Sequence, residues 1–198
     1  MSTYLSVKII IPYILLGISL IIWALIPFRQ YRGSFFLFFL ILALSDPIVL
    51  IYHAIVPIHP FRIYIVVFLF TIYSIMNFET VKKRLAVLII LAALDICFAV
   101  YAGIFLLRVI LFFEDFVILY LILGKTLSNI TRTYAINVFY FVLNFYVLTL
   151  LIKDFIVLID VKTGIYYFYI TSALEILISI YFVFYNDKNS FRYKFKSV

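Results

Sequence analysis

Charged residues are scarce in this chain, and their scarcity excludes a water-soluble fold. Lys, Arg, Asp and Glu make up 13% of the 198 residues, whereas apolar residues make up 68% and the mean hydropathy is +1.24. Soluble domains carry about a quarter charged residues and about half apolar ones. A soluble fold of this size has too little interior to hide so much apolar surface. The composition therefore predicts an integral membrane protein.

Cysteine and histidine are also rare, which removes several kinds of chemistry. The only cysteine is Cys97, so a disulfide within the chain is excluded, and its apolar surroundings indicate a small buried hydrophobe. The two histidines, His53 and His59, are too few for a histidine-rich zinc hydrolase. The sequence shows no nucleophile–base pair, CxxC motif or phosphate loop. We therefore expect no metal and no cofactor, assign no catalytic residue, and favour a protein that is not an enzyme.

What the chain has instead is long apolar runs, each near the roughly 20 residues that a spanning helix needs. They lie at about 6–27, 34–57, 61–78, 85–102, 104–124, 134–152 and 163–185. The first run exceeds the apolar core of a signal peptide and no cleavage site follows it, so we interpret it as a spanning helix. The predicted fold is all-α, a polytopic membrane bundle of about seven transmembrane helices. Residues 1–198 form one integral membrane domain, in which 186–198 are a basic cytoplasmic tail.

Residues 85–124 form one apolar stretch that needs a break. A single helix of that length would be about 60 Å long, twice the hydrocarbon thickness of a bilayer. Two helices with a turn at Ala102–Gly103 fit better, because basic residues precede the stretch and Lys125 follows it. The two ends of the stretch are therefore expected on the same side of the membrane.

The basic residues predict the orientation of the bundle. The net charge is +7, and the cationic residues are spread over short loops and the tail instead of one basic face, so no nucleic-acid partner is expected. One side of the predicted bundle holds Arg29, Arg32, Lys82, Lys83, Arg84, Lys125, Arg132, Lys188, Arg192, Lys194 and Lys196. The other side holds Lys8, Arg62, Lys153 and Lys162. The positive-inside rule then places the C-terminus in the cytoplasm and the N-terminus outside.

Five of the nine acids lie inside predicted helices, close to the membrane midplane, while the others lie in predicted loops or the tail. The five are Asp46, Asp95, Glu114, Asp115 and Glu175. A charged side chain at that depth costs about 2.5–3.5 kcal/mol on insertion scales. We therefore expect these carboxyl groups to face the bundle interior and share protons, water or a cation.

Further polar residues lie at helical spacing from these acids or from one another. Asp46 and His53 are seven residues apart on one helix face, and Pro47 is expected to kink that helix. Asn137 and Asn144 are also seven apart. Thr171 and Glu175 belong to a polar stripe along the last helix. The predicted ligand-binding or ion-binding residues are Asp46, His53, Asp95, Glu114, Asp115, Asn137, Asn144, Thr171 and Glu175.

Three functions fit this pattern. The first is binding or translocation of protons, a cation or a small cationic or amphipathic solute through an acidic cavity within the membrane. The second is a seven-helix sensor or accessory subunit that contacts a membrane partner or a second copy of itself. The third is an intramembrane enzyme acting on a lipid or isoprenoid; FFED at 112–115 is similar to the acid pair of membrane-bound lycopene cyclase domains but lacks the preceding proline. The expected location is the plasma (inner) membrane of a prokaryote, with the lipid bilayer as a partner.

Overall fold

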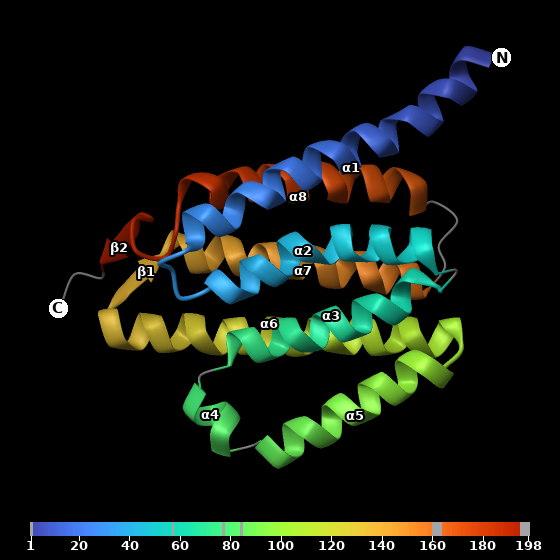
Figure 1. The fold of residues 1–198 in the computed structure, drawn as a ribbon. Coiled ribbons are helices and arrows are strands. Elements are labelled where there is room, and N and C mark those ends of the chain that lie inside the picture. Colours follow the sequence, from blue (N-terminus) through green and yellow to red (C-terminus); the bar gives the residue numbers. More distant parts are fainter. Residues whose placement is uncertain (1, 57, 77, 84, 160–163, 195–198) are drawn as a thin grey trace.

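The chain folds into helices and one small pair of strands (Figure 1). The computed structural model describes residues 2–56, 58–76, 78–83, 85–159 and 164–194, with side chains left undescribed at 2–11, 78–80 and 164–168. The helices are α1 (Ser2–Gln30), α2 (Phe36–Ile55), α3 (Pro60–Ile75), α4 (Phe78–Lys83), α5 (Leu85–Tyr101), α6 (Ile104–Thr133), α7 (Val138–Leu158) and α8 (Gly164–Phe184). The strands β1 (Ala135–Asn137) and β2 (Arg192–Lys194) pair antiparallel, with Ile136 opposite Tyr193.

Six of the helices form a closed ring, and the side chains on their inward faces meet in its interior. Around it, α1 packs on α2, α2 on α3, α3 on α6, α6 on α7, α7 on α8, and α8 back on α1 (Figure 1). Helix α5 lies outside the ring, against α3. Most side chains of α5 are exposed, and only Leu88 and Ala99 on it are buried. Cys97 is exposed on this helix, so the interpretation of Cys97 as a buried hydrophobe is wrong.

Each of the seven predicted segments overlaps a helix, and the predicted turn at Ala102–Gly103 is confirmed. Helix α5 ends at Tyr101, α6 begins at Ile104, and Gly103 caps α6 in an extended conformation. The boundaries of the next two helices differ from the prediction. The predicted loop after residue 124 is helical to Thr133, where Tyr134 ends α6 in the left-handed conformation with φ 49°. Helix α7 continues to Leu158, because the apolar run resumes after Lys153 and Asp154.

Short polar devices fix the ends of the helices. Asn137 caps α7 by accepting a hydrogen bond from the Phe139 backbone N–H at 3.0 Å. Its amide nitrogen also donates to the Asp187 carbonyl oxygen at 2.8 Å, which ties the start of α7 to the segment after α8. Asn137 therefore precedes α7, and the prediction that it shares a helix face with Asn144 is wrong.

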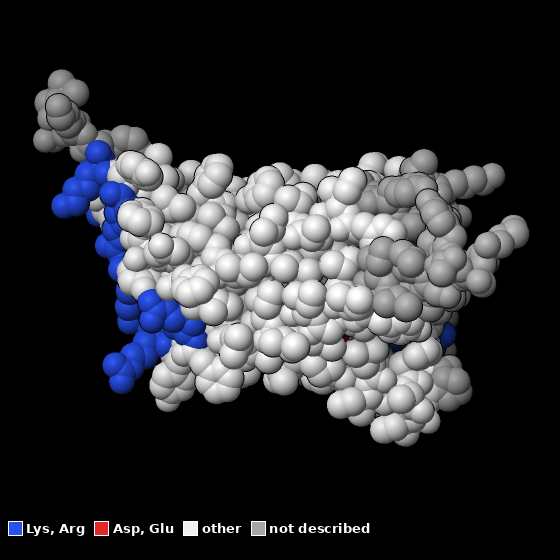
Figure 2. Space-filling model, turned by 90° about the horizontal axis from the view of Figure 1, so that it is seen from above, with Lys and Arg blue, Asp and Glu red and all other residues white. Residues whose placement is uncertain are grey.

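One end of the bundle carries the strand pair and most of the visible positive charge; we call it the basic end. Helices α1, α4 and α6 finish there with Arg29, Lys82, Lys83 and Arg132 in their last turns. Figure 2 shows Lys and Arg gathered at this end, while most of the rest of the face in view is uncharged. The side chains of Lys8, Glu79, Arg84, Asp160, Lys162 and Lys196, which entered the charge predictions, lie outside the described residues.

The half of the ring nearest the basic end is filled by aromatic and aliphatic side chains. Phe39 and Phe182 are fully buried with ring centroids 4.8 Å apart, and Phe139 packs on both of them. Leu143 and Ile122 are fully buried in the same cluster. We call this group the aromatic cluster. Its dense packing joins α2, α6, α7 and α8 near their basic ends.

Among the residues whose side chains the structure describes, three helices are long and apolar enough to cross a membrane: α2, α7 and the Pro12–Gln30 part of α1. Shorter apolar helices lie at Pro60–Ile75, Leu85–Tyr101 and Tyr169–Phe184. Helix α6 has the length but carries Arg108, Glu114 and Asp115. The chain is thus a mostly helical bundle with the character of a membrane protein.

Candidate functional site

The interior of the ring is hollow beyond the aromatic cluster. A cavity of about 350 Å³ lies there, and all six ring helices contribute to its wall. Trp23 and Tyr146 separate it from the aromatic cluster: both line the cavity, their rings lie 5.2 Å apart, and Trp23 also packs on Phe39. The cavity therefore lies between the aromatic cluster and the end of the bundle that is opposite the basic end.

Four carboxyl groups and one lysine line this cavity. The carboxyl groups come from four different helices: Asp46 on α2, Asp115 on α6, Asp154 on α7 and Glu175 on α8. Lys153 on α7 is the only basic side chain in the wall of the cavity within the described part of the chain. If all five groups are ionised, the lining carries a formal charge of −3. The cavity is therefore strongly acidic.

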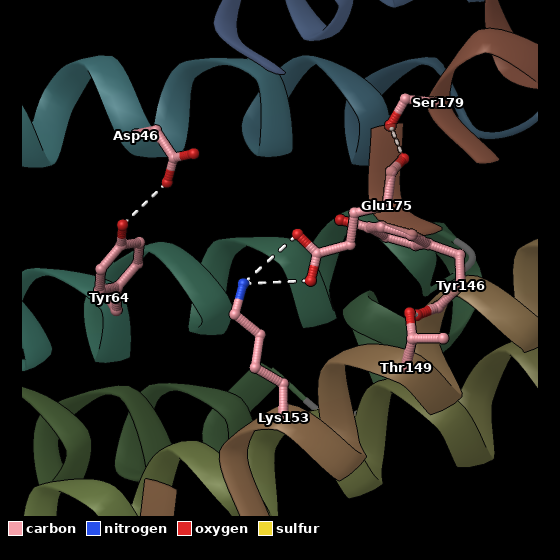
Figure 3. Close-up of polar contacts among 7 residues, drawn as sticks. All are labelled: Asp46, Tyr64, Tyr146, Thr149, Lys153, Glu175 and Ser179. Carbon is pink, nitrogen blue, oxygen red and sulfur yellow. Dashed lines mark hydrogen bonds and ion pairs between the residues drawn. The ribbon is translucent and has the colours of Figure 1, made fainter. Parts of the chain in front are cut away.

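Lys153 and Glu175 form an ion pair across the cavity between α7 and α8. The Lys153 Nζ lies 3.1 Å from the Glu175 Oε1 and 3.3 Å from its Oε2 (Figure 3). Ser179, one turn further along α8, donates its hydroxyl to the Glu175 carbonyl oxygen at 2.6 Å. The two-oxygen contact compensates the Glu175 charge locally.

Asp46 is held by a tyrosine from the neighbouring helix. The Tyr64 hydroxyl donates to the Asp46 Oδ1 at 2.8 Å (Figure 3). Pro47 follows directly and has no N–H to donate, so the Ala43 carbonyl loses its helical partner. Ser45 turns its hydroxyl to the nearby Leu42 carbonyl at 2.7 Å. The Ser-Asp-Pro sequence thus places two polar side chains on the cavity face of α2, since Ser45 and Asp46 both line it.

Asp115 and Asp154 face each other without a donor between them. Asp115 is 0% exposed, and no hydrogen-bond donor reaches either of its oxygens. The Asp154 carboxyl lines the same cavity, close enough for the charges of the two groups to interact. Two ionised carboxylates only accept hydrogen bonds, so this contact forms a bond only when one of the two carries a proton. The pair therefore needs a positive charge, as a shared proton or as a bound cation.

Aromatic and apolar side chains form the rest of the wall. Phe61, Tyr64 and Phe68 on α3 line the cavity together with Trp23 and Tyr146. Such a mainly apolar lining with a few polar groups is typical of small-molecule sites, which span about 300–1,000 Å³.

Arg108 lies at the edge of the cavity furthest from the basic end. Its guanidinium is 5.6 Å from the centre of the Phe61 ring and donates to the Val157 carbonyl at 3.2 Å. Phe61 and Val157 both line the cavity. Arg108 thus joins α3, α6 and α7 at this edge.

A second, smaller cavity continues the first between α1, α2 and α8. Its volume is about 200 Å³, and Asp46, Tyr64, Lys153 and Glu175 line both cavities. Pro12, Leu15 and Leu16 on α1 complete its wall. The ion pair and the Asp46–Tyr64 contact therefore lie between the two spaces.

Three of the nine predicted site residues line the main cavity: Asp46, Asp115 and Glu175. Glu114 is buried on α6 but does not line it, and both of its carboxyl oxygens lack a hydrogen-bond partner. Asp95 lies on α5, outside the ring, close enough to Glu114 for their charges to interact. Adjacent positions on a helix point about 100° apart, which explains why Glu114 and Asp115 have different surroundings.

The remaining predicted residues have other environments. His53 is exposed, and its Nδ1 contacts the Ile58 carbonyl at 3.1 Å, so it does not share the cavity with Asp46. Asn144 donates to the Thr126 hydroxyl and the Tyr140 carbonyl, both at 2.7 Å, and joins α7 to α6. Thr171 is buried on α8, one turn before Glu175. Asn137 has the capping role described above.

The prediction missed Lys153 and Asp154, which it assigned to a loop. Both lie inside α7 and line the cavity. The signal was present: apolar residues at 155–159 follow them, and Tyr146, Leu150, Lys153 and Val157 recur at helical spacing. The prediction ends the helix at the charged pair Lys153 and Asp154, whereas α7 continues for about another turn to Leu158.

The arrangement differs from a metal site. Within the described residues, no three His, Cys, Asp or Glu side chains converge closely enough to hold a metal ion. The carboxyl groups surround a space instead of a point.

Comparisons with protein-family models, with characterised proteins and with solved structures found no match to this chain. The interpretation of the cavity therefore depends on its own residues and geometry.

Proposed function

We propose that this protein crosses the membrane seven times and that its acidic cavity binds and translocates a positively charged species, either a proton or a cation. The seven crossings are α1, α2, α3, α5, α6, α7 and α8, with the basic end in the cytoplasm. The positive-inside rule supports this orientation, because most of the Lys and Arg in view gather at the basic end (Figure 2). An odd number of crossings agrees with the start of α1 and the strand β2 lying at opposite ends of the bundle (Figure 1).

The charges of α6 support its place in the membrane. Asp115 faces the ring interior and Glu114 is buried, so neither is presented to lipid. Helix α3 has 16 residues and is about 24 Å long, shorter than a hydrocarbon core of about 30 Å. Local thinning of the bilayer or flanking residues accommodate such a mismatch at modest cost.

The observation that carries the functional proposal is the state of Asp115. It is fully buried, no donor reaches its oxygens, and it lines a cavity that already holds three further carboxyl groups. Leaving a buried charge without a partner costs several kcal/mol. A proton or cation in the cavity removes that cost. Ionisable residues facing a cavity within the membrane are typical of ion and proton pathways.

Flux through proteoliposomes tests this function directly. Purified protein is reconstituted, and uptake of protons and of monovalent cations is followed under an imposed gradient with an internal dye. We expect Asp115→Asn to reduce the rate at least tenfold. Asp95→Asn is the control, since Asp95 is a carboxyl on α5, outside the ring, and its rate should stay within twofold of the unmodified protein.

Equal rates for Asp115→Asn and the unmodified protein would overturn the proposal. So would an equal loss in Asp95→Asn, because the cavity would then not be the determinant. Cation binding without flux would instead favour the sensor or subunit function.

Cysteine labelling tests the orientation. In a Cys97→Ser background, single cysteines replace Lys188, which is exposed near the basic end, or Tyr101, which is 83% exposed at the end of α5. A membrane-impermeant maleimide added to intact cells should label the Tyr101→Cys variant and leave the Lys188→Cys variant unlabelled until the membrane is opened. The reverse pattern, or labelling of both from one side, would contradict seven crossings in this orientation.

A further inference from the structure

We propose that the cation is a small organic ammonium ion, and that it enters the cavity in exchange for a single proton shared by Asp115 and Asp154. This inference depends on the proposed function, because it identifies the class of solute and the accompanying proton movement at the same site. It follows from three features of the cavity: how its charges are paired, what forms its walls and how the two aspartates meet.

The pairing of the charges leaves one place for a cation. Lys153 compensates Glu175, and the Tyr64 hydroxyl donates to Asp46. The pair formed by Asp115 and Asp154 has no such donor, and Asp115 is fully buried. A cation that enters the cavity is therefore attracted first to this pair.

The walls favour an organic cation over an inorganic one. Inorganic cations such as Ca²⁺ and Mg²⁺ need several oxygen ligands at about 2.0–2.6 Å. In the part of the chain that the structure describes, the acids do not converge in that way. Aromatic faces, by contrast, attract alkylammonium groups, at about 0.5–2 kcal/mol per contact. Trp23, Phe61, Tyr64, Phe68 and Tyr146 supply such faces.

The size of the cavity agrees with this class of solute. At about 30 Å³ per water molecule in the liquid, 350 Å³ corresponds to roughly ten waters, which is room for a cation with a short apolar body. The smaller connected cavity adds about 200 Å³ beside Asp46 and Glu175. A single dehydrated metal ion would leave most of this space without a contact.

The exchange follows from competition for the same two carboxyl groups. In the empty cavity the pair holds one proton, because two neighbouring carboxylates repel each other and no donor reaches Asp115. An ammonium ion placed beside the pair stabilises both groups as carboxylates, so the proton leaves to water. One positive charge enters and one leaves; no covalent bond to carbon or nitrogen forms or breaks.

Other charged and titratable groups surround the pair on the ring helices, and they bias this competition. They are Asp46 on α2, Tyr64 on α3, Glu114 on α6, Tyr146 and Lys153 on α7, and Glu175 on α8. From α1 the lining residues are Ser19 and Trp23, which do not titrate. The acids favour any positive charge at the pair, whereas Lys153 opposes it. Because the ion pair cancels Lys153 and Glu175, the remaining acids hold a proton at the pair until another cation replaces it.

Calorimetry with choline and its uncharged analogue 3,3-dimethyl-1-butanol tests the solute class and the exchange together. The full chain is reconstituted in nanodiscs, and each compound is titrated in two buffers with different ionisation enthalpies. We expect choline to bind and the uncharged analogue, which has nearly the same shape, to bind at least tenfold more weakly. The buffer dependence should correspond to about one proton released per choline bound near pH 7, so choline affinity rises about tenfold per pH unit.

Two variants and one control separate the exchange from general damage. Asp115→Asn and Asp154→Asn each remove one partner, and each should abolish proton release and weaken choline binding about tenfold or more. Asp95→Asn, on α5 outside the ring, should keep both the affinity and the proton release. Thermal unfolding of every variant identifies any that does not fold, and the other aspartate variant then provides the result.

The outcomes distinguish this inference from the proposed function. Choline binding without proton release overturns the exchange. Flux of protons or Na⁺ that depends on Asp115, with no binding of choline, overturns the organic solute and leaves the proposed function standing. If neither choline binding nor Asp115-dependent flux is measured, both proposals fail.

Discussion

The aromatic cluster and the acidic cavity are enclosed by the same ring of helices, yet they are filled in opposite ways. In the cluster, Phe39, Phe139 and Phe182 pack with ring centroids 4.8–6.2 Å apart and are fully buried. In the cavity, aromatic side chains line an open space of about 350 Å³. Trp23 and Tyr146 mark the boundary between the two.

The polar side chains near these two regions also differ in their hydrogen bonding. Near the cluster, Gln30 donates its amide to the Phe182 and Tyr185 carbonyls, and Asn137 bonds both Phe139 and Asp187. In the cavity, Asp115 has no donor. Proteins tolerate few buried polar groups without partners, and those that persist commonly have a function. The comparison teaches that side chains near the cluster link neighbouring elements by hydrogen bonds, while the buried carboxyl of Asp115 in the other half has no donor, which is the feature behind our proposal of cation binding.

The largest effect on stability is expected from the aromatic cluster. Replacing Phe39, which is fully buried between α2 and α8, by Ala leaves a void and should lower the free energy of unfolding by about 3–5 kcal/mol. Phe113→Ala is the control, because Phe113 is 62% exposed on the bundle surface. Denaturant or thermal unfolding in detergent measures the difference. A cost below 1 kcal/mol for Phe39→Ala would show that the cluster is not tightly packed.

A smaller loss of stability is expected from the polar link beside the cluster. Gln30 is buried, and its side chain joins the end of α1 to the end of α8 at 2.9 Å and 2.8 Å. Gln30→Leu removes both hydrogen bonds and should cost about 1–3 kcal/mol in the same unfolding assay. The exposed neighbour variant Arg29→Gln should cost less than about 0.5 kcal/mol. Neither change should alter cation flux; a large loss of flux in Gln30→Leu would mean that the two regions are coupled.

The smallest effect, and the one most specific to the cavity, concerns its single lysine. Lys153→Gln removes the positive charge beside Glu175 and should raise cation affinity about tenfold, since a unit charge roughly 10 Å away contributes on the order of 1–2 kcal/mol at an effective dielectric near 20. Glu175→Gln leaves Lys153 behind and should lower the affinity by a similar factor. Calorimetry with choline measures both.

We also expect Lys153→Gln to change the stability of the protein. Without a cation, Lys153→Gln should unfold at a lower temperature, because Glu175 loses its partner. A saturating cation should restore part of that loss, since ligand binding stabilises the folded state. If both variants shift the cation affinity in the same direction, the charge balance of the cavity does not control binding.

The helices were largely predictable, because their signal is local. Apolar runs of sufficient length occur at each of the seven predicted segments, and the length of 85–124 required the break found at Ala102–Gly103. Helix ends were harder to predict. Helix α6 runs on through polar residues to Thr133, where the pairing of β1 with β2 brings in a segment far along the chain. No local pattern contains that contact.

The candidate site was predictable in kind but not in membership. Asp46, Asp115 and Glu175 were identified from their depth in apolar runs, and all three line the cavity. Glu114 and Asp95 satisfied the same criterion and do not. Depth along a helix can be estimated from the sequence, whereas the direction that a side chain faces depends on which neighbours the helix packs against.

The sequence by itself determined that this is a helical chain with membrane character, that its basic residues are unevenly distributed, and that acids interrupt its apolar segments. These properties follow from composition and spacing, which act within single helices. Only the tertiary structure decided that α5 lies outside the ring, and that Lys153 and Asp154 join the acids of three other helices around one space. Which helices form the ring and which side chains line the cavity depend on packing between helices distant in sequence, so both are fixed only when the ring closes.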